Sequence, residues 1–82
     1  MSKRADYAGR LKELVNEMAS TDVTVDVDSD LVDEIGLSSV EIMELVEAIE
    51  DTYDISFPLN DLASMRTIND LAAELDRLLA NR

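Results

Sequence analysis

The stretch GLSSVEIMELVEAIE, residues 36–50, carries the strongest structural signal in this chain. Its apolar residues recur at the i, i+3, i+4, i+7 spacing of one helical face. They are Ile42, Leu45, Val46 and Ile49. Ser38 precedes this pattern as a candidate N-cap, and Glu41 stands three residues later, which completes a capping box. The stretch therefore predicts a helix that begins after Ser38 and ends near residues 52–54.

Two further amphipathic segments lie on either side of this helix. The first runs from Arg4 to Ala19, and its apolar face consists of Tyr7, Leu11, Leu14, Val15 and Met18. The last begins at Thr67, with Asp70 in a capping-box position, and its apolar face consists of Ile68, Leu71, Ala72, Leu75 and Leu79. Both patterns have the helical period, so we expect each segment to bury one face in a shared core.

The connecting segments carry weaker signals. The valines of residues 23–27 alternate with polar residues as in a strand, but no second alternating run exists to pair with them. We therefore expect an extended loop that lays these valines on the core. Pro58 opens a second connection and predicts a short helical turn over residues 59–64. The expected fold is all-α, a small four-helix bundle of three longer helices and one short helix, with a long loop between the first two, in a single domain over residues 1–82.

The charge of the chain restricts its partners. Its 82 residues include 19 Asp and Glu against 7 Lys and Arg, for a net charge of -12. No basic residue lies between Glu13 and Met65. Such a charge argues against nucleic acid and against an anionic membrane surface, because both are bound through basic contacts. It favours a basic protein partner or a cation, or it serves as a solubilising surface.

Other features of the composition bear on the compartment. Cysteine is absent, so disulfides and thiolate chemistry are excluded. Residues 1–19 lack the continuous apolar run of a signal peptide, and no segment is long enough to cross a bilayer. We therefore expect the protein in the cytoplasm. We also expect it to be a monomer.

Ser39 lies at the start of the predicted second helix without the groups that would make it catalytic. A nucleophilic serine needs a positioned base, yet the chain has no histidine, and both of its lysines lie in the first helix. We therefore expect no enzyme activity, no catalytic residue, and a serine that is the substrate of another enzyme. Backbone N–H groups at a helix start bind anions, so an anionic group attached at this position would be stabilised.

Two apolar residues of the second helix fall outside its buried arc. Val40 and Met43 stand among the acidic residues Glu44, Glu47, Glu50 and Asp51. Isolated exposed apolar residues are common on protein surfaces. Their position beside Ser39 and among carboxylates favours a docking surface, on which apolar contacts give affinity and the acids steer a basic partner.

The acidic loop before this helix offers a different interpretation. Asp26, Asp28 and Asp30 match positions 1, 3 and 5 of an EF-hand calcium loop. The match then fails, because Leu31 occupies the glycine position and Leu37 occupies the position of the glutamate ligand. We expect no specific metal site, although loose binding of divalent cations by clustered carboxylates stays open.

Several segments together resemble the acyl carrier protein family. Residues 33–41 resemble its prosthetic-group attachment motif, with Ser39 at the modified serine, and residues 44–50 resemble its acidic second helix. Residues 53–58 resemble its aromatic-Asp-x-x-apolar-Pro loop, and residues 65–71 resemble the start of its last helix. The similarity extends from about Leu31 to Leu79.

The resemblance implies a specific function. A phosphopantetheinyl transferase would load Ser39 with 4'-phosphopantetheine from coenzyme A, and the terminal thiol of this arm would hold an acyl group as a thioester. The protein would carry that group among acyl-loading and synthase enzymes of fatty acid or polyketide-type synthesis, which would present basic patches to it. Alternatives are an aminoacyl or peptidyl carrier on the same arm, and a small acidic cation-binding or interaction module with an unmodified serine.

The resemblance also assigns surface and core positions. The partner-docking positions are Val40, Glu41, Met43, Glu44, Glu47 and Asp51. The candidate lining of an acyl-chain pocket is Ile42, Leu45, Val46, Ile49, Leu62, Ile68 and Leu71. Ser38 departs from the family, which most often has Asp before the modified serine. Serine caps a helix about as well as aspartate, so we expect the fold to be unaffected. The change removes one negative charge beside the attachment site, which alters what a transferase or synthase recognises and favours a specialised pathway.

Overall fold

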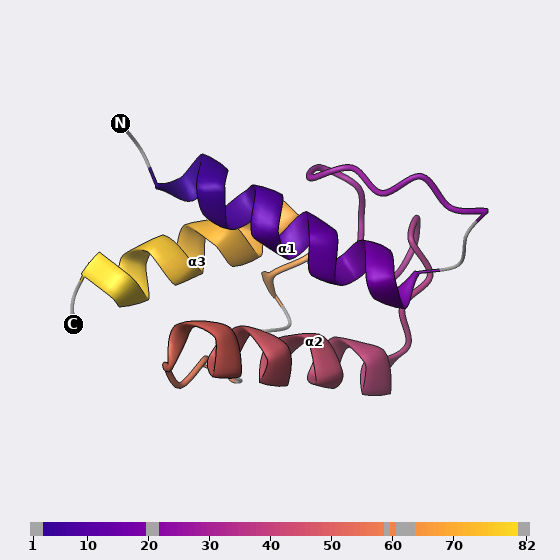
Figure 1. The fold of residues 1–82 in the computed structure, drawn as a ribbon. Helices are drawn as coiled ribbons and strands as arrows, with labels where there is room; N and C mark the ends of the chain where they lie inside the picture. The colour runs from indigo at the N-terminus through magenta and orange to yellow at the C-terminus, as the bar shows by residue number, and fades with distance from the viewer. Residues whose placement is uncertain (1–2, 20–21, 59, 61–63, 81–82) are drawn as a thin grey trace.

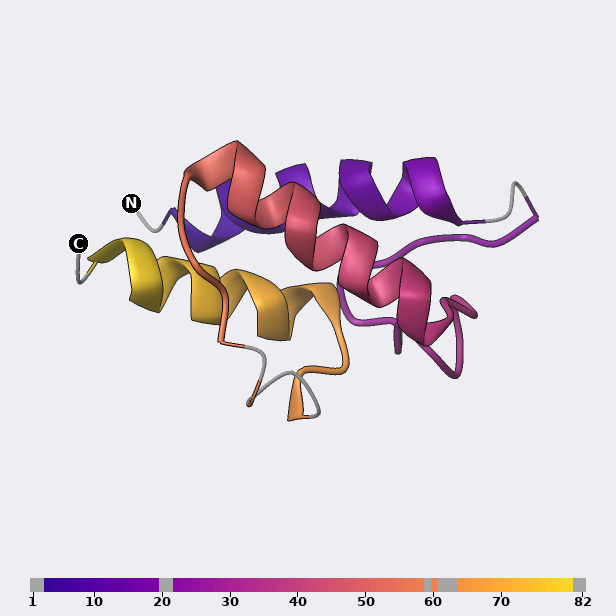
Figure 2. The ribbon, with the colours of Figure 1, turned by 90° about the horizontal axis from the view of Figure 1, so that it is seen from below.

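The computed structural model describes residues 3–19, 22–58, 60 and 64–80, in which all regular structure is helical. The three helices are α1 (Arg4–Met18), α2 (Ser39–Tyr53) and α3 (Ile68–Ala80). Helix α1 packs against both α2 and α3, and the long first loop lies at the opposite end of the molecule from the start of α1 and the end of α3 (Figures 1 and 2). The all-α prediction is confirmed. The short helical turn predicted over residues 59–64 falls largely on residues outside the described ranges.

The core is built from the predicted helical faces together with apolar residues of the first loop. Its buried members are Ala8, Leu11, Val15, Val25, Leu31, Ile35, Leu37, Leu45, Val46, Ile49, Phe57, Ile68, Leu71, Ala72 and Leu75. Four of them come from residues 22–38, which have no regular structure. The first loop is therefore a structural part of the core.

Both ends of α2 are fixed by local hydrogen bonds. The Ser38 side chain accepts from the Glu41 backbone N–H at 3.2 Å, and the Glu41 carboxylate accepts from the Ser38 N–H at 3.0 Å, so the predicted capping box is confirmed. At the other end Asp54 adopts a left-handed conformation (φ 54°), and its N–H donates to the carbonyl of Glu50. The Glu50 carboxylate also accepts from the Phe57 N–H at 2.8 Å. This bond directs the chain back toward the core.

A second capping box starts α3. The Thr67 hydroxyl accepts from the Asp70 N–H at 3.1 Å. The Asp70 carboxylate accepts from the N–H groups of Thr67, at 3.2 Å, and Arg66, at 2.9 Å. The sequence signal at Thr67 therefore marks the N-cap, and the helix itself begins one residue later.

The first loop is tied to the start of α3. The Asn69 N–H donates to the Val27 carbonyl at 3.0 Å, and its side-chain amide donates to the Asp28 carboxylate at 2.5 Å. The Leu31 N–H donates to the Arg66 carbonyl at 2.8 Å. Since these bonds are made to a helix start and not to a strand, the valines of residues 23–27 lie in an extended loop, as predicted.

An aromatic contact joins α1 to α2. The rings of Tyr7 and Tyr53 meet edge to face, with centroids 5.5 Å apart, and join the first turns of α1 to the end of α2. Among the described residues, none of the helices combines the length and the apolar character that crossing a membrane requires.

The packing of α3 gives a stability prediction. Leu75 is fully buried, so Leu75→Ala should lower the free energy of unfolding by about 2–5 kcal/mol, because it leaves a cavity in the core. Leu78→Ala is the matched control on the same helix and should cost clearly less, since Leu78 is only half-buried. Urea unfolding followed by circular dichroism measures both values. Equal losses would contradict this placement of the core.

Candidate functional site

Ser39 is the first residue of α2, and its side chain is exposed. The capping box engages the neighbouring Ser38, so the Ser39 hydroxyl lies outside the bonds that start the helix. The first backbone N–H groups of a helix have no intrahelical acceptor, and they carry the positive end of the helix dipole. A phosphate on this hydroxyl would therefore lie in a favourable local field.

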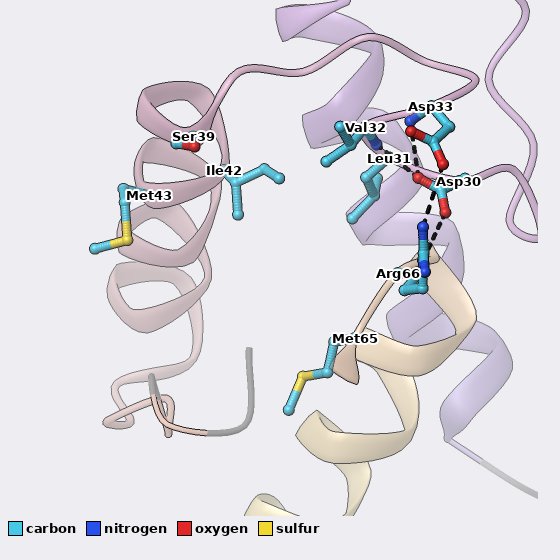
Figure 3. A pocket seen from close by; sticks show the side chains of 9 residues that line it. All are labelled: Asp30, Leu31, Val32, Asp33, Ser39, Ile42, Met43, Met65 and Arg66. Atoms are coloured by element: carbon cyan, nitrogen blue, oxygen red, sulfur yellow. Dashed lines mark hydrogen bonds and ion pairs between the residues drawn. The ribbon is translucent and has the colours of Figure 1, made fainter. Parts of the chain in front are cut away.

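An open groove of about 490 Å³ borders Ser39, and we call it the Ser39 groove. Its lining residues are Asp30, Leu31, Val32, Asp33, Ser39, Ile42, Met43, Met65 and Arg66. Figure 3 shows Ile42 pointing from α2 toward Leu31 and Val32 across the groove. One wall thus comes from α2, and the other from the turn at residues 30–33 and the segment before α3.

An ion-pair cluster supports the second wall. The Arg66 guanidinium donates to the Asp30 carboxylate at 2.9 Å and to the Asp33 carboxylate at 3.2 Å (Figure 3). The other oxygen of Asp30 accepts from the backbone N–H groups of Val32, at 2.9 Å, and Asp33, at 2.8 Å. We call the side chains of Asp30, Asp33 and Arg66 the clasp.

The clasp shifts the ionisation of its members. The Asp33 N–H, followed by the Arg66 side chain and the Val32 N–H, holds the pKa of Asp30 below its ordinary value, although desolvation opposes the shift. The hydrogen bond to Asp30 and the two carboxylate charges raise the pKa of Arg66. Both groups are therefore charged throughout the neutral range.

The outer side of α2 carries exposed apolar and acidic residues side by side. Val40 is 68% exposed and Met43 is 41% exposed. The carboxylates of Glu44, Glu47 and Asp51 are also exposed. Glu41 differs, because it is half-buried and its carboxylate is engaged in the capping box. Five of the six positions expected to dock a partner are thus exposed. The sixth, Glu41, is half-buried and caps the helix start.

The residues expected to line an acyl-chain pocket occupy different places. Ile42 lines the Ser39 groove. Five others are packed in the core with at most 1% of their surface exposed, and they are Leu45, Val46, Ile49, Ile68 and Leu71. Leu62 lies outside the described residues. The core behind Ile42 is therefore closed in this conformation.

Sequence reasoning missed the second wall of the groove. Val32 lies in none of the motifs above, and Met65 and Arg66 appear there only within residues 65–71, as the start of the last helix. The Arg66–Asp30 pair joins residues 36 positions apart. One signal was present, because Arg66 is the only basic residue between Lys12 and Arg77. A lone cation in so acidic a chain is expected to pair with carboxylates distant in sequence.

The acidic loop shows no arrangement suited to a metal ion. Within the described ranges, His, Cys, Asp and Glu side chains nowhere form a group of three or more that could hold one. Asp28 instead accepts from Asn69, and Asp30 pairs with Arg66. These carboxylates are used to attach the first loop to the start of α3.

The pKa of Asp30 tests the clasp. Arg66→Gln should raise this pKa, yet leave it below the ordinary value, because the Asp33 N–H is the largest cause and remains. The stabilising contribution of Asp30 is complete above the unfolded pKa, about 3.9, and is lost as the pH falls through the lower folded pKa. NMR titration of the side-chain carboxyl carbons measures the shift. A pKa that does not respond to the substitution would rule out the ion pair in solution.

Comparisons with known proteins bear directly on this geometry. The family model described as the phosphopantetheine attachment site matches residues 9–75. An acyl carrier protein from Streptomyces coelicolor is 36% identical over 85 residues, covering 98% of this chain and 92% of that protein. Another from Rhodococcus erythropolis is 33% identical over 72 residues, covering 88% and 77%. A solved structure of a proposed acyl carrier protein from Mycobacterium tuberculosis, 22% identical, shares the fold with a TM-score of 0.74, covering 84% of this chain and 93% of that one. The chain therefore belongs to the acyl carrier protein family, whose prosthetic group is 4'-phosphopantetheine.

Proposed function

We propose that Ser39 carries the 4'-phosphopantetheine arm and that the protein transports acyl intermediates between the enzymes that load and process them. The observation that supports this most directly is an exposed serine hydroxyl in the first turn of α2, at the edge of an apolar groove. The residues present fit the group, because the hydroxyl is accessible to a transferase and the helix start favours a phosphodiester. Its resemblance to the family motif, its exposure and its place at a helix start all support Ser39 as the attachment position.

The roles of the chain's own residues follow from this assignment. Ser38 and Glu41 close the capping box, fix the first turn of α2 and so present the Ser39 hydroxyl outward. When attached, the arm supplies a terminal thiol that holds the acyl group as a thioester. The chain has no histidine or cysteine to supply a base or a nucleophile. We therefore assign it a carrier role and leave the chemistry to its partner enzymes.

The exposed side of α2 is our candidate docking surface for those enzymes. Val40 and Met43 offer apolar contact, and the carboxylates around them attract a basic patch. The net charge of -12 extends this attraction beyond the contact itself and raises the rate of encounter.

We further propose the kind of acyl cargo and the pocket that would hold it. The acyl carrier relatives favour an acyl cargo over an aminoacyl one. We place this carrier in fatty acid or polyketide-type synthesis. Ser38 in place of the family's usual Asp favours a specialised pathway. Ile42 would stand at the mouth of an acyl pocket, and the buried residues behind it would line the pocket after the core opens. One carrier domain over residues 1–82, acting as a monomer in the cytoplasm, completes the proposal.

Attachment at Ser39 is tested by intact mass spectrometry. After incubation with coenzyme A and a broad-range phosphopantetheinyl transferase, the wild-type chain should gain one phosphopantetheinyl group, and Ser39→Ala should gain none. Ser38→Ala is the matched control. It should lower stability by about 1 kcal/mol through loss of the cap, yet still be loaded. Loading of Ser39→Ala, or no gain with several transferases, would overturn the assignment.

The docking surface is tested by reversing its charge. Glu44→Lys with Glu47→Lys should slow acyl transfer from a partner enzyme by about tenfold or more at low salt, because steering is lost. The control is Asp6→Lys with Glu17→Lys, which makes the same change in net charge on exposed positions of α1. Stopped-flow transfer rates over a range of ionic strength separate the two. Equal slowing by both pairs would assign the effect to net charge and refute a specific surface on α2.

A further inference from the structure

We propose that Arg66 is a positioning residue for the arm. Through the clasp, it holds Val32 and Met65 as the second wall of the Ser39 groove, in which the apolar segment of the arm next to its phosphate rests. This inference rests on the proposed attachment at Ser39. It adds the resting place of the arm and the residue that maintains it.

Arg66 connects to the turn at residues 30–33 twice, once through its side chain to Asp30 and Asp33, and once through its carbonyl, which accepts from the Leu31 N–H. Its own N–H donates to Asp70, so Arg66 is also fixed to the first turn of α3. The turn that carries Val32 and the segment that carries Met65 are therefore joined as one wall.

This wall presents apolar surface to the Ser39 groove. Val32 is 54% exposed, although it is a large apolar residue, and Met65 and Ile42 are half-buried on the same groove. Apolar surface beside the attachment point gains free energy when an apolar group covers it. The arm brings such a group, because two geminal methyls lie one methylene beyond its phosphate ester. Attachment at Ser39 keeps them at high effective concentration, so a weak contact is enough.

Arg66 also balances negative charge beside Ser39. A phosphodiester at Ser39 is anionic, and Asp30 and Asp33 face the same groove. Arg66 sets one positive charge against these two negative ones, and it is the only basic residue from position 13 to position 76. Without Arg66, both carboxylates would repel the phosphate, and mutual repulsion would also separate them from each other. The guanidinium thus supports the wall and lowers the negative potential beside the arm.

The experiment compares methyl contacts in the loaded protein. Methyl-labelled wild-type chain is loaded with an unlabelled arm, loading is verified by intact mass, and contacts to the geminal methyls are recorded by filtered NOE spectroscopy. The same measurement is made for Arg66→Gln, Arg66→Lys and Asp33→Asn. Arg10→Gln is the matched control, because it removes an equal charge from an exposed pair with Glu13 on α1.

In the wild type we expect contacts from the arm to Val32 and Met65, together with contacts to Ile42. Arg66→Gln should lose the contacts to Val32 and Met65, Asp33→Asn should weaken them, and Arg66→Lys should restore part of them. Arg10→Gln should leave them unchanged.

The outcomes separate the inference from the function on which it rests. A loaded wild type without these contacts, or a loaded Arg66→Gln that keeps them all, would overturn the role of Arg66 alone. A chain that is never loaded would overturn the attachment at Ser39 and this inference with it. If Arg66→Gln does not fold, Asp33→Asn and the wild-type contacts test the inference. Asp33→Asn is suitable because the Asp33 carboxylate is exposed.

Discussion

The first loop keeps its shape because its polar backbone finds hydrogen-bond partners at the start of α3. A connection this long without regular structure is uncommon in a small domain, and its buried polar groups need partners. The Val27 carbonyl and the Leu31 N–H find theirs at Asn69 and Arg66. With the backbone satisfied in this way, the loop can place Val25 and other apolar side chains in the core. Helix α2 then starts at a position fixed by the loop that leads to it.

The geometry of the site follows from the hydrogen bonds that hold the first loop at the start of α3. Because the turn at residues 30–33 is held on α3, it stands opposite the first turns of α2 and leaves the Ser39 groove between them. The capping box uses Ser38 and Glu41, so the next hydroxyl along the chain is left exposed. A hydroxyl at a helix start, beside a largely apolar groove, suits a prosthetic group whose attached end is anionic and whose next segment is apolar. The same few bonds thus stabilise the fold and shape the proposed attachment site.

The sequence predicted what is locally encoded and missed what depends on contacts across the chain. Caps and helical period are local, which is why both capping boxes and the extended valine loop could be predicted. The groove needs Arg66 to meet Asp30, and no spacing rule connects them. Helical period also identifies a buried face without telling whether that face is packed or lines a cavity. Leu45 and Leu71 illustrate this, since they were expected to line a pocket and are fully packed here.

The distribution of positive charge separates the two surfaces that we assign to this carrier. A Lys or Arg placed on α2 three or four residues from Glu44 or Glu47 would pair with that carboxylate and weaken the field that attracts a basic partner. Arg66 avoids this effect, because it is committed at short range to Asp30 and Asp33 on the other side of the groove. Its charge would act on a phosphate attached at Ser39, and salt screens it over longer distances. A single cation just before α3 would therefore support the proposed arm while α2 stays fully acidic.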